Sequence, residues 1–180
     1  MRAPAIILKK IPIREYDELI ICYTQNTGKQ VYQAKSILRP TSKQAGHLDV
    51  LNLVDFSLVH KNSHPIITSA YCIDAFSQLK SSLPAMSVAY FLLECFDKLV
   101  FENEPDQKLW DFLVSQIKYY DEKAHMLTNL AHARFVSIDT MITAARQELL
   151  KILGYDPGMP IEHLANTQFK SLQFAREVLR

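Results

Sequence analysis

The stretch ELIICYTQNTGKQVYQAKSI, residues 18–37, contains two runs rich in apolar, aromatic and β-branched residues on either side of Asn26-Thr27-Gly28-Lys29. Two such runs separated by a short polar segment with a glycine are typical of a β-hairpin. Gly28 can adopt the positive φ that a tight turn requires, because it has no Cβ atom. The stretch therefore predicts two antiparallel strands, and the fold class depends on what surrounds them.

Three more strand-like runs lie around this hairpin. AIILKKIPI precedes it, and DVLNLVDFSLVHK and IITSAYCI follow it, at residues 5–13, 49–61 and 66–73. Polar turns separate neighbouring runs, among them REYD before the hairpin and NSHP between the last two. Five short strands at this spacing predict a small closed barrel or sandwich, and five is the number of strands in an OB-fold.

After Asp74 the pattern changes to that of helices. Apolar residues recur at steps of three and four, which predicts four helices. Their approximate ranges are 84–103, 105–120, 131–152 and 161–179. Gly154 ends the third, as glycine commonly does just after a helix. We therefore predict an α+β chain, with an all-β OB-fold barrel in 1–80 and an all-α helical bundle in 81–180.

The distribution of charge distinguishes the two halves. The 180 residues carry a formal net charge of +1. Residues 1–80 contain ten Lys and Arg against six Asp and Glu, whereas residues 81–180 contain ten against thirteen. A basic half joined to an acidic half suggests that the first meets a polyanion, although a chance imbalance of a few charges is the alternative.

Metal-binding patterns are weak. The three cysteines are far apart and form no Cys-x-x-Cys pair. His60 and His64 flank a turn, which does not give the geometry of two ligands on a helix. His125 and His132 have no cysteine or carboxylate partner at ligand spacing. We expect no metal site.

Catalytic and membrane-spanning patterns are also missing. A phosphate-binding loop would need a glycine in place of Tyr23 and a Ser or Thr in place of Gln30. The carboxylates are scattered, and no nucleophile has the context of an elbow or a triad. No apolar run approaches the roughly 18 residues of a membrane span. We therefore expect a cytoplasmic protein with no catalytic residue, cofactor or membrane partner.

Basic and aromatic residues are interleaved along the predicted barrel. Cations can follow the phosphates of a single strand while rings stack on its bases, so this mixture favours nucleic-acid binding. Core packing is the favoured role for Phe56 and an equally open one for Tyr32, and a solvated surface is the alternative for each cation. The predicted contacts are Lys9, Lys10, Arg14, Lys29, Lys35, Arg39, Lys43 and Tyr32, with Lys61 as a further cation.

Three motifs follow one another along the same half. An acidic E-x-D turn precedes a strand, T-x-x-x-G-K follows, and a basic loop ends in S-x-x-x-G-x-L. The matching residues are Glu15, Asp17, Thr24, Gly28, Lys29, Ser42, Gly46 and Leu48. This ordered combination resembles the N-terminal domain of RecO, the family of bacterial recombination-repair mediators.

The helical half continues the resemblance, which covers the chain from Ala5 to Pro157. The residues that match the family's helix pair are Tyr90, Glu94, Asp97, Leu99, Glu102, Glu104 and Pro105. LLKILGYDP, at 149–157, is similar to the next helix end of the family. Many members carry a four-cysteine zinc module after this point, where the present chain has GMPIEHLANTQ. We therefore expect a shortened member without zinc.

The resemblance implies a DNA-binding protein. RecO proteins bind single- and double-stranded DNA, anneal complementary strands, and act with RecR and single-stranded DNA-binding protein to load RecA. Arg39 and Lys43 would then reach the DNA backbone from the loop at 38–46, whose path Pro40 restrains. Gly46 would ease the exit of that loop if its φ is positive. A location in the bacterial cytoplasm, at the nucleoid, would follow.

Two other functions remain open. The chain could be a non-catalytic adaptor with little affinity for DNA, whose helical half docks RecR or single-stranded DNA-binding protein. More distantly, its barrel could prefer structured RNA. The family binds the acidic, apolar tail of single-stranded DNA-binding protein, which implies an apolar cleft with cations at its rim. The predicted partner-binding residues are Lys118, Lys123 and Arg134, with solvated helix ends as the alternative.

Overall fold

The structure is a computed structural model that describes residues 2–60, 64–129, 134–165 and 167–178. It forms two compact units. The barrel unit comprises Met1–Ala75 and Val100–Trp110, and the helical unit comprises Phe76–Leu99 and Asp111–Arg180. The boundary expected near residue 80 therefore lies five residues beyond Ala75, where the chain first leaves the barrel unit. The chain returns to the barrel unit at Val100–Trp110.

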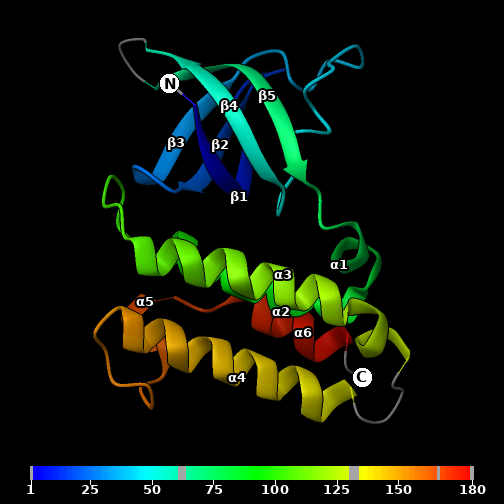
Figure 1. Ribbon diagram of the computed structural model, residues 1–180, viewed down its shortest axis with the longest axis vertical. Coiled ribbons are helices and arrows are strands. Elements are labelled where there is room, and N and C mark those ends of the chain that lie inside the picture. Colours follow the sequence, from blue (N-terminus) through cyan, green and yellow to red (C-terminus); the bar gives the residue numbers. More distant parts are fainter. Residues whose placement is uncertain (1, 61–63, 130–133, 166, 179–180) are drawn as a thin grey trace. The chain divides into compact units, whose positions relative to one another are not determined.

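The barrel unit is a closed barrel of five strands, as predicted. Its strand order is β1-β2-β3-β5-β4, in which β1 pairs with both β2 and β4 and a short parallel pairing of β3 with β5 completes the ring (Figure 1). The strands are β1 (Arg2–Pro12), β2 (Glu18–Thr24), β3 (Gly28–Ala34), β4 (Leu53–Val59) and β5 (Ile66–Asp74). Closure leaves no long unpaired edge, and the arrangement is consistent with an OB-fold.

Alternating residues of the strands fill the barrel. Ile20 and Cys22 of β2 point to the same face, as the two-residue period of a strand requires. Tyr32 and Phe56 meet edge to face, with ring centroids 5.2 Å apart. Each fully buried large apolar side chain stabilises the fold by about 1.5–3 kcal/mol. The core residues are Ala5, Ile7, Ile20, Cys22, Tyr32, Ala34, Ile37, Leu48, Val54, Phe56 and Ile67.

The segment between two helices packs on the barrel at the β2–β3 turn. The backbone N–H of Asn103 donates to the carbonyl of Lys29 at 3.1 Å, and Nε2 of Gln30 donates to Oδ1 of Asn103 at 3.1 Å. Gly28 has φ +71°, and a Cβ atom there would lie 2.3 Å from the carbonyl oxygen of Glu104. Glycine at this position therefore allows both the tight turn and the close approach of the Glu104 backbone.

Six helices are assigned in the described residues after the barrel strands. They are α1 (Ser77–Ser81), α2 (Leu83–Leu99), α3 (Gln107–Asn129), α4 (Arg134–Ile152), α5 (Ile161–Ala165) and α6 (Lys170–Val178). The first four residues of α3 belong to the barrel unit. Within the helical unit, α2 packs against α1, α4, α5 and α6, and ten of its 17 residues are buried, so it is the central helix.

The ends of α4 and α6 have clear causes. Gly154 has φ +80°, and the N–H of Tyr155 donates to the carbonyl of Leu150, so α4 ends in a Schellman motif at the predicted glycine. The single helix predicted over 161–179 is two helices instead. Glu94 of α2 accepts hydrogen bonds from the backbone N–H groups of Lys170 and Ser171 and from the Ser171 hydroxyl. Such capping fixes a new helix start inside one periodic run.

None of the helices that the structure describes has both the length and the apolar character needed to cross a membrane.

Candidate nucleic-acid interface

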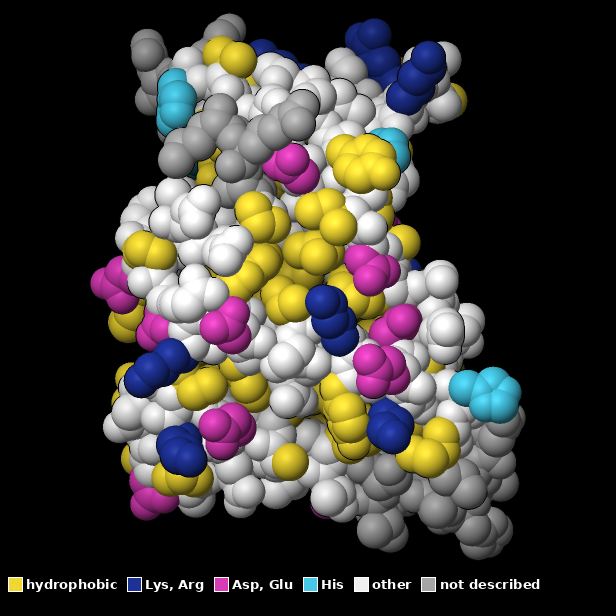
Figure 2. All heavy atoms as spheres, viewed as in Figure 1, with side chains coloured by type: hydrophobic (Ala, Val, Ile, Leu, Met, Phe, Trp, Pro, Cys, Tyr) yellow, Lys and Arg dark blue, Asp and Glu magenta, His cyan; other side chains and the backbone are white. Residues whose placement is uncertain are grey.

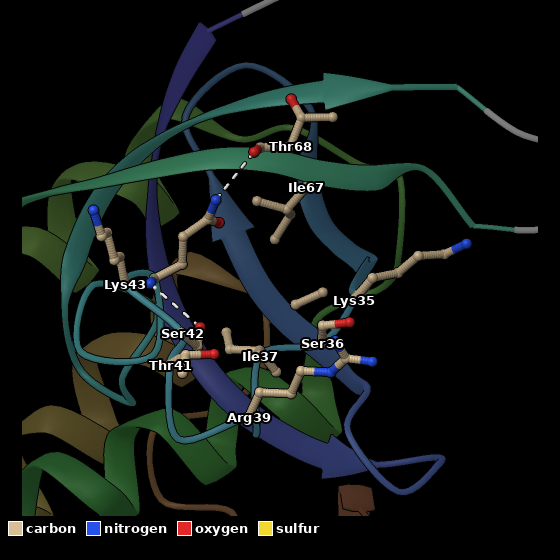
Figure 3. A pocket seen from close by; sticks show the side chains of 11 residues that line it. Lys35, Ser36, Ile37, Arg39, Thr41, Ser42, Lys43, Ile67 and Thr68 are labelled. Atoms are coloured by element: carbon tan, nitrogen blue, oxygen red, sulfur yellow. Dashed lines mark hydrogen bonds between the residues drawn. The ribbon is translucent and has the colours of Figure 1, made fainter.

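A hollow of about 390 Å³ opens in the barrel unit between the connection that follows β3 and the start of β5. Figure 3 shows Lys43 on one side of it, Lys35 on the other and Arg39 at the lower edge of the view. Hydroxyl groups of serine and threonine lie between these cations. The lining residues are Ala34, Lys35, Ser36, Ile37, Arg39, Thr41, Ser42, Lys43, Gln44, Ile67 and Thr68.

The three cations of the hollow are exposed. Within the described residues, no carboxylate forms an ion pair with Lys35, Arg39 or Lys43. In the face drawn in Figure 2, Lys and Arg side chains project at the upper right, where Figure 1 shows the connection between β3 and β4. Cations without a carboxylate partner around a concave surface suit an anion such as a phosphate.

Asp17 fixes the entrance of the connection. Its Oδ1 accepts a hydrogen bond from the backbone N–H of Ser36 at 2.7 Å, and its Oδ2 accepts one from Nε2 of Gln33 at 3.2 Å. Ser36 has φ +54°, a left-handed conformation that is unfavourable for a residue with a Cβ atom. The bonds to Asp17 offset that cost, which explains the acid of the E-x-D motif in physical terms.

Arg39 is held against the turn between β1 and β2. Its Cζ lies 5.2 Å from the centroid of the Tyr16 ring, and the N–H of Leu38 donates to the Tyr16 carbonyl at 3.1 Å. Ile37, two residues earlier, is buried in the barrel core. A cation over a tyrosine ring loses less freedom when it binds an anion than one on an unrestrained stem.

Asn52 fixes the exit of the connection. Its Nδ2 donates to the carbonyls of Gly46 and His47, both at 3.0 Å, and the residue is 1% exposed. Leu51 has φ +74°, so the chain turns here and β4 starts at Leu53, later than the predicted strand from 49. Gly46 does not have a positive φ, and the role considered for it there is wrong.

Gln44 ties the connection to β5. Its Nε2 donates to the carbonyl of Thr68 at 3.0 Å, and its backbone N–H donates to Oγ of Ser42 at 3.4 Å (Figure 3). Local sequence patterns mark Asp17 as a motif residue, but they do not predict that Asp17, Gln44 and Asn52 organise this region. A buried asparagine inside an apolar run was the available signal for Asn52, because such a side chain needs partners.

The structure places the other predicted DNA contacts differently. Lys9 and Arg14 are exposed but do not line the hollow, and Nζ of Lys10 lies 3.2 Å from Oε2 of Glu18. Lys29 and Tyr32 are 8% and 5% exposed, so they offer little surface to a strand, and contact with DNA stays an untested prediction for both.

Lys61 lies outside the described residues. Among residues that the structure does describe, no group of three or more His, Cys, Asp or Glu side chains could hold a metal ion. The absence of a metal site remains a prediction.

The predicted partner-binding cations lie on two helices. Lys118 is exposed on α3, and Nζ of Lys123 lies 5.9 Å from the Tyr119 ring centroid. Arg134 is the first residue of α4, and its side chain is outside the described ones. A role in partner binding stays a prediction for all three.

Comparison with known proteins agrees with the barrel. Residues 1–76 match the family model described as "Recombination protein O N terminal". Proteins named DNA repair protein RecO are similar over longer stretches. That of Desulforamulus reducens is 28% identical over 113 residues, which are 63% of this chain and 44% of the relative.

Two further relatives cover more of the helical unit. DNA repair protein RecO of Roseiflexus sp. is 27% identical over 88% of this chain and 51% of its own length. That of Salinibacter ruber is 25% identical over 88% of this chain and 58% of its own length. The chain thus spans about half the length of the curated relatives it matches. The barrel, the motif residues and these similarities agree: the barrel unit matches the RecO N-terminal family model, and the chain is similar to DNA repair proteins RecO over most of its length.

Proposed function

We propose that the barrel unit binds the phosphate backbone of DNA at the hollow between the β3–β4 connection and β5. The observation that carries this proposal is the set of exposed cations, Lys35, Arg39 and Lys43, around one concave surface. The guanidinium of Arg39 can bind a phosphate through two parallel hydrogen bonds, and the lysines add point charges. Serine and threonine hydroxyls can donate to further phosphate oxygens.

Contacts of this kind do not read sequence. Phosphate contacts position a protein on a nucleic acid, whereas base edges specify sequence, and the hollow offers mainly the former chemistry. Binding should therefore be tolerant of sequence and strongly dependent on salt, because each neutralised phosphate releases counterions. Such a protein can hold two strands without selecting a site, which is what annealing of arbitrary complementary strands requires.

Similarity to RecO proteins suggests the wider role that we propose. The chain would act in DNA repair and recombination by binding single- and double-stranded DNA, promoting annealing, and helping RecR to load RecA on DNA covered by single-stranded DNA-binding protein. The relatives' name, DNA repair protein RecO, supports the process. The hollow supports the contact with DNA. No catalytic step is part of this proposal.

Fluorescence anisotropy with labelled single-stranded and duplex oligonucleotides tests it. At low salt we expect saturable binding of both, with the logarithm of the association constant falling linearly as the logarithm of the salt concentration rises. Oligonucleotides of unrelated sequence should bind within a small factor of one another. Absence of binding at low salt would overturn the proposal and favour the adaptor function.

One observation keeps the adaptor function in view for the helical unit. Tyr119 and Met126 are large exposed side chains on α3, with Lys123 between them in sequence and near the Tyr119 ring. Residues spaced by four and three lie on one face of a helix, so they form an apolar patch with a cation. Such a patch suits an acidic, apolar peptide tail. Lys123→Glu should weaken the binding of that peptide without changing the binding of DNA, and unchanged peptide affinity would exclude Lys123.

A further inference from the structure

Tyr71 and His47 form an exposed ring pair on the barrel unit. Tyr71 lies on β5 and is 68% exposed, which is unusual for so large a ring. The imidazole of His47 stacks on it, with ring centroids 6.2 Å apart and an angle of 28° between the planes. One face of the tyrosine thus has a partner, and much of the remaining ring is open to solvent.

The histidine of this pair is fixed by two hydrogen bonds. Its Nδ1 accepts from the backbone N–H of Cys72 at 3.2 Å, and its carbonyl accepts from Nδ2 of Asn52 at 3.0 Å. Nδ1 therefore directs its lone pair at β5, and the ring proton of the neutral form is on Nε2. Because the pair is already ordered, a ligand that stacks on it would restrict little additional motion.

The two rings lie close in sequence to residues that line the hollow. Thr68 and Gln44 line the hollow and are joined by a hydrogen bond, and Tyr71 and His47 each lie three residues further along the chain. Three residues of a strand span about 10 Å. The rings are thus within reach of a nucleotide whose neighbouring phosphate occupies the hollow.

We propose that Tyr71 and His47 form a stacking site for an unpaired nucleobase beside the phosphate-binding hollow. This inference rests on the proposed function. Asp55 lies directly opposite Tyr71 on β4, and its negative charge disfavours a phosphate at this point. The chemistry therefore changes along the path, from cations that suit phosphates to rings that suit an uncharged base.

Such a site distinguishes single strands from duplexes. Bases of a duplex are already stacked and paired, so they cannot add a contact with the tyrosine unless the duplex opens. A base of a single strand can stack without that cost. Loss of one stacked base weakens binding roughly 5- to 150-fold.

The test compares Tyr71→Ala and Tyr71→Phe in the full chain. We expect Tyr71→Ala to weaken binding of an unstructured single strand roughly 5- to 150-fold, with unchanged duplex affinity and an unchanged salt slope. Tyr71→Phe keeps the ring and should bind like the unaltered chain. A thermal melt confirms that each variant is folded.

A second measurement needs no variant. A single strand that carries abasic sites keeps its phosphates but offers fewer bases, so the unaltered chain should bind it more weakly than the intact strand. If the unaltered chain binds abasic and intact strands equally, the inference is wrong. Unchanged single-strand affinity in Tyr71→Ala, or equal losses on single strand and duplex, would also overturn it and leave the proposed function standing. No binding of any DNA by the unaltered chain would overturn both.

Discussion

Two connections of the barrel unit differ in charge and in how they are held. The connection 35–52, between β3 and β4, has three Lys and Arg against one Asp, whereas the segment 100–110 has three Asp and Glu against one Lys. They adjoin opposite ends of β3, about 20 Å apart by the rise of its seven residues. That separation exceeds the Debye length of about 10 Å at 0.1 M salt, so the acidic segment does little to weaken the field of the basic one.

The manner of attachment teaches more than the charge. Side chains hold the basic connection, chiefly Asp17 at its entrance and Asn52 at its exit, and its cations remain exposed. The acidic segment is held by direct backbone contact as well as by side chains: the N–H of Asn103 donates to the carbonyl of Lys29, and the backbone of Glu104 approaches Gly28 too closely for any side chain there. The first arrangement leaves a polar surface for a ligand, and the second serves to attach the segment to the barrel.

Gly28→Ala should give the largest effect and act on the acidic segment. The left-handed φ alone costs roughly 1–2 kcal/mol with a Cβ atom, and the new atom would overlap the carbonyl of Glu104. We expect the free energy of unfolding to fall by more than about 2 kcal/mol in urea titrations. The emission of Trp110, the chain's single tryptophan, should also shift, because this buried residue ends the same segment.

Gly46→Ala is the matched control in the basic connection. Its Cβ atom would have no heavy atom within 4 Å, and Gly46 does not have a positive φ. The free energy of unfolding should change by no more than about 0.5 kcal/mol. Equal losses in the two alanine variants would contradict the distinction between the two connections.

Asn52→Ala should act on the basic connection. It removes two hydrogen bonds from a buried position and leaves the carbonyls of Gly46 and His47 without that donor. We expect a loss of about 1–3 kcal/mol in the free energy of unfolding. DNA binding should weaken as well, because the exit of the loop is no longer fixed. A variant that unfolds like the unaltered chain would show that Asn52 does not organise the connection.

The start of α6, which Glu94 holds by hydrogen bonds, is a third anchored segment. Its contribution to stability can be measured through its dependence on pH. Burial tends to raise the pKa of Glu94, but hydrogen bonds from Ser171, Lys98 and Lys170 outweigh it and hold that pKa below its ordinary value of 4.5. The contribution of Glu94 to stability is therefore complete above pH 4.5 and is lost as the pH falls through the lower pKa of the folded state. Unfolding in urea from pH 6 to pH 3 measures it, and Glu94→Gln should show a weaker dependence on pH than the unaltered chain.

Glu102→Gln should have the smallest effect. It removes one exposed negative charge from the acidic segment. If DNA affinity followed net charge alone, the variant would bind more tightly. If the local field of the basic connection decides, as the separation and screening indicate, anisotropy at 0.1 M salt should show a change of less than about twofold. A clear gain in affinity would favour the net-charge explanation.

The sequence predicts the order and type of the main elements because periodicity records which face is buried. The five strands, the positive φ of Gly28 and the helix end at Gly154 follow from local patterns. The return of 100–110 to the barrel unit does not, because it depends on contacts between residues far apart in the chain, such as the approach of the Glu104 backbone to Gly28. The break between α5 and α6 is hidden for the same reason, since Glu94 lies 76 residues before Lys170.

The site was predictable in part. Lys35, Arg39 and Lys43 were candidates because of their charge, and the structure gathers them at one hollow. Lys29 and Tyr32 were candidates because of their charge and ring, but the structure buries most of both side chains. Charge and residue type can be read from a sequence, whereas the side of the barrel on which a residue lies depends on register and on segments distant in the chain.

The most direct test of the central claim is a salt titration of DNA binding by the Arg39→Ala/Lys43→Ala variant. The loop substitutions should change the free energy of unfolding by no more than about 0.5 kcal/mol. If both side chains contact phosphates, single strands of every sequence should bind more weakly by a similar factor, and the slope of log affinity against log salt should flatten by about 1.4, or 0.7 per lost contact. A variant that retains both its affinity and its slope would contradict the claim and move the DNA path to Lys9, Lys10 and Arg14.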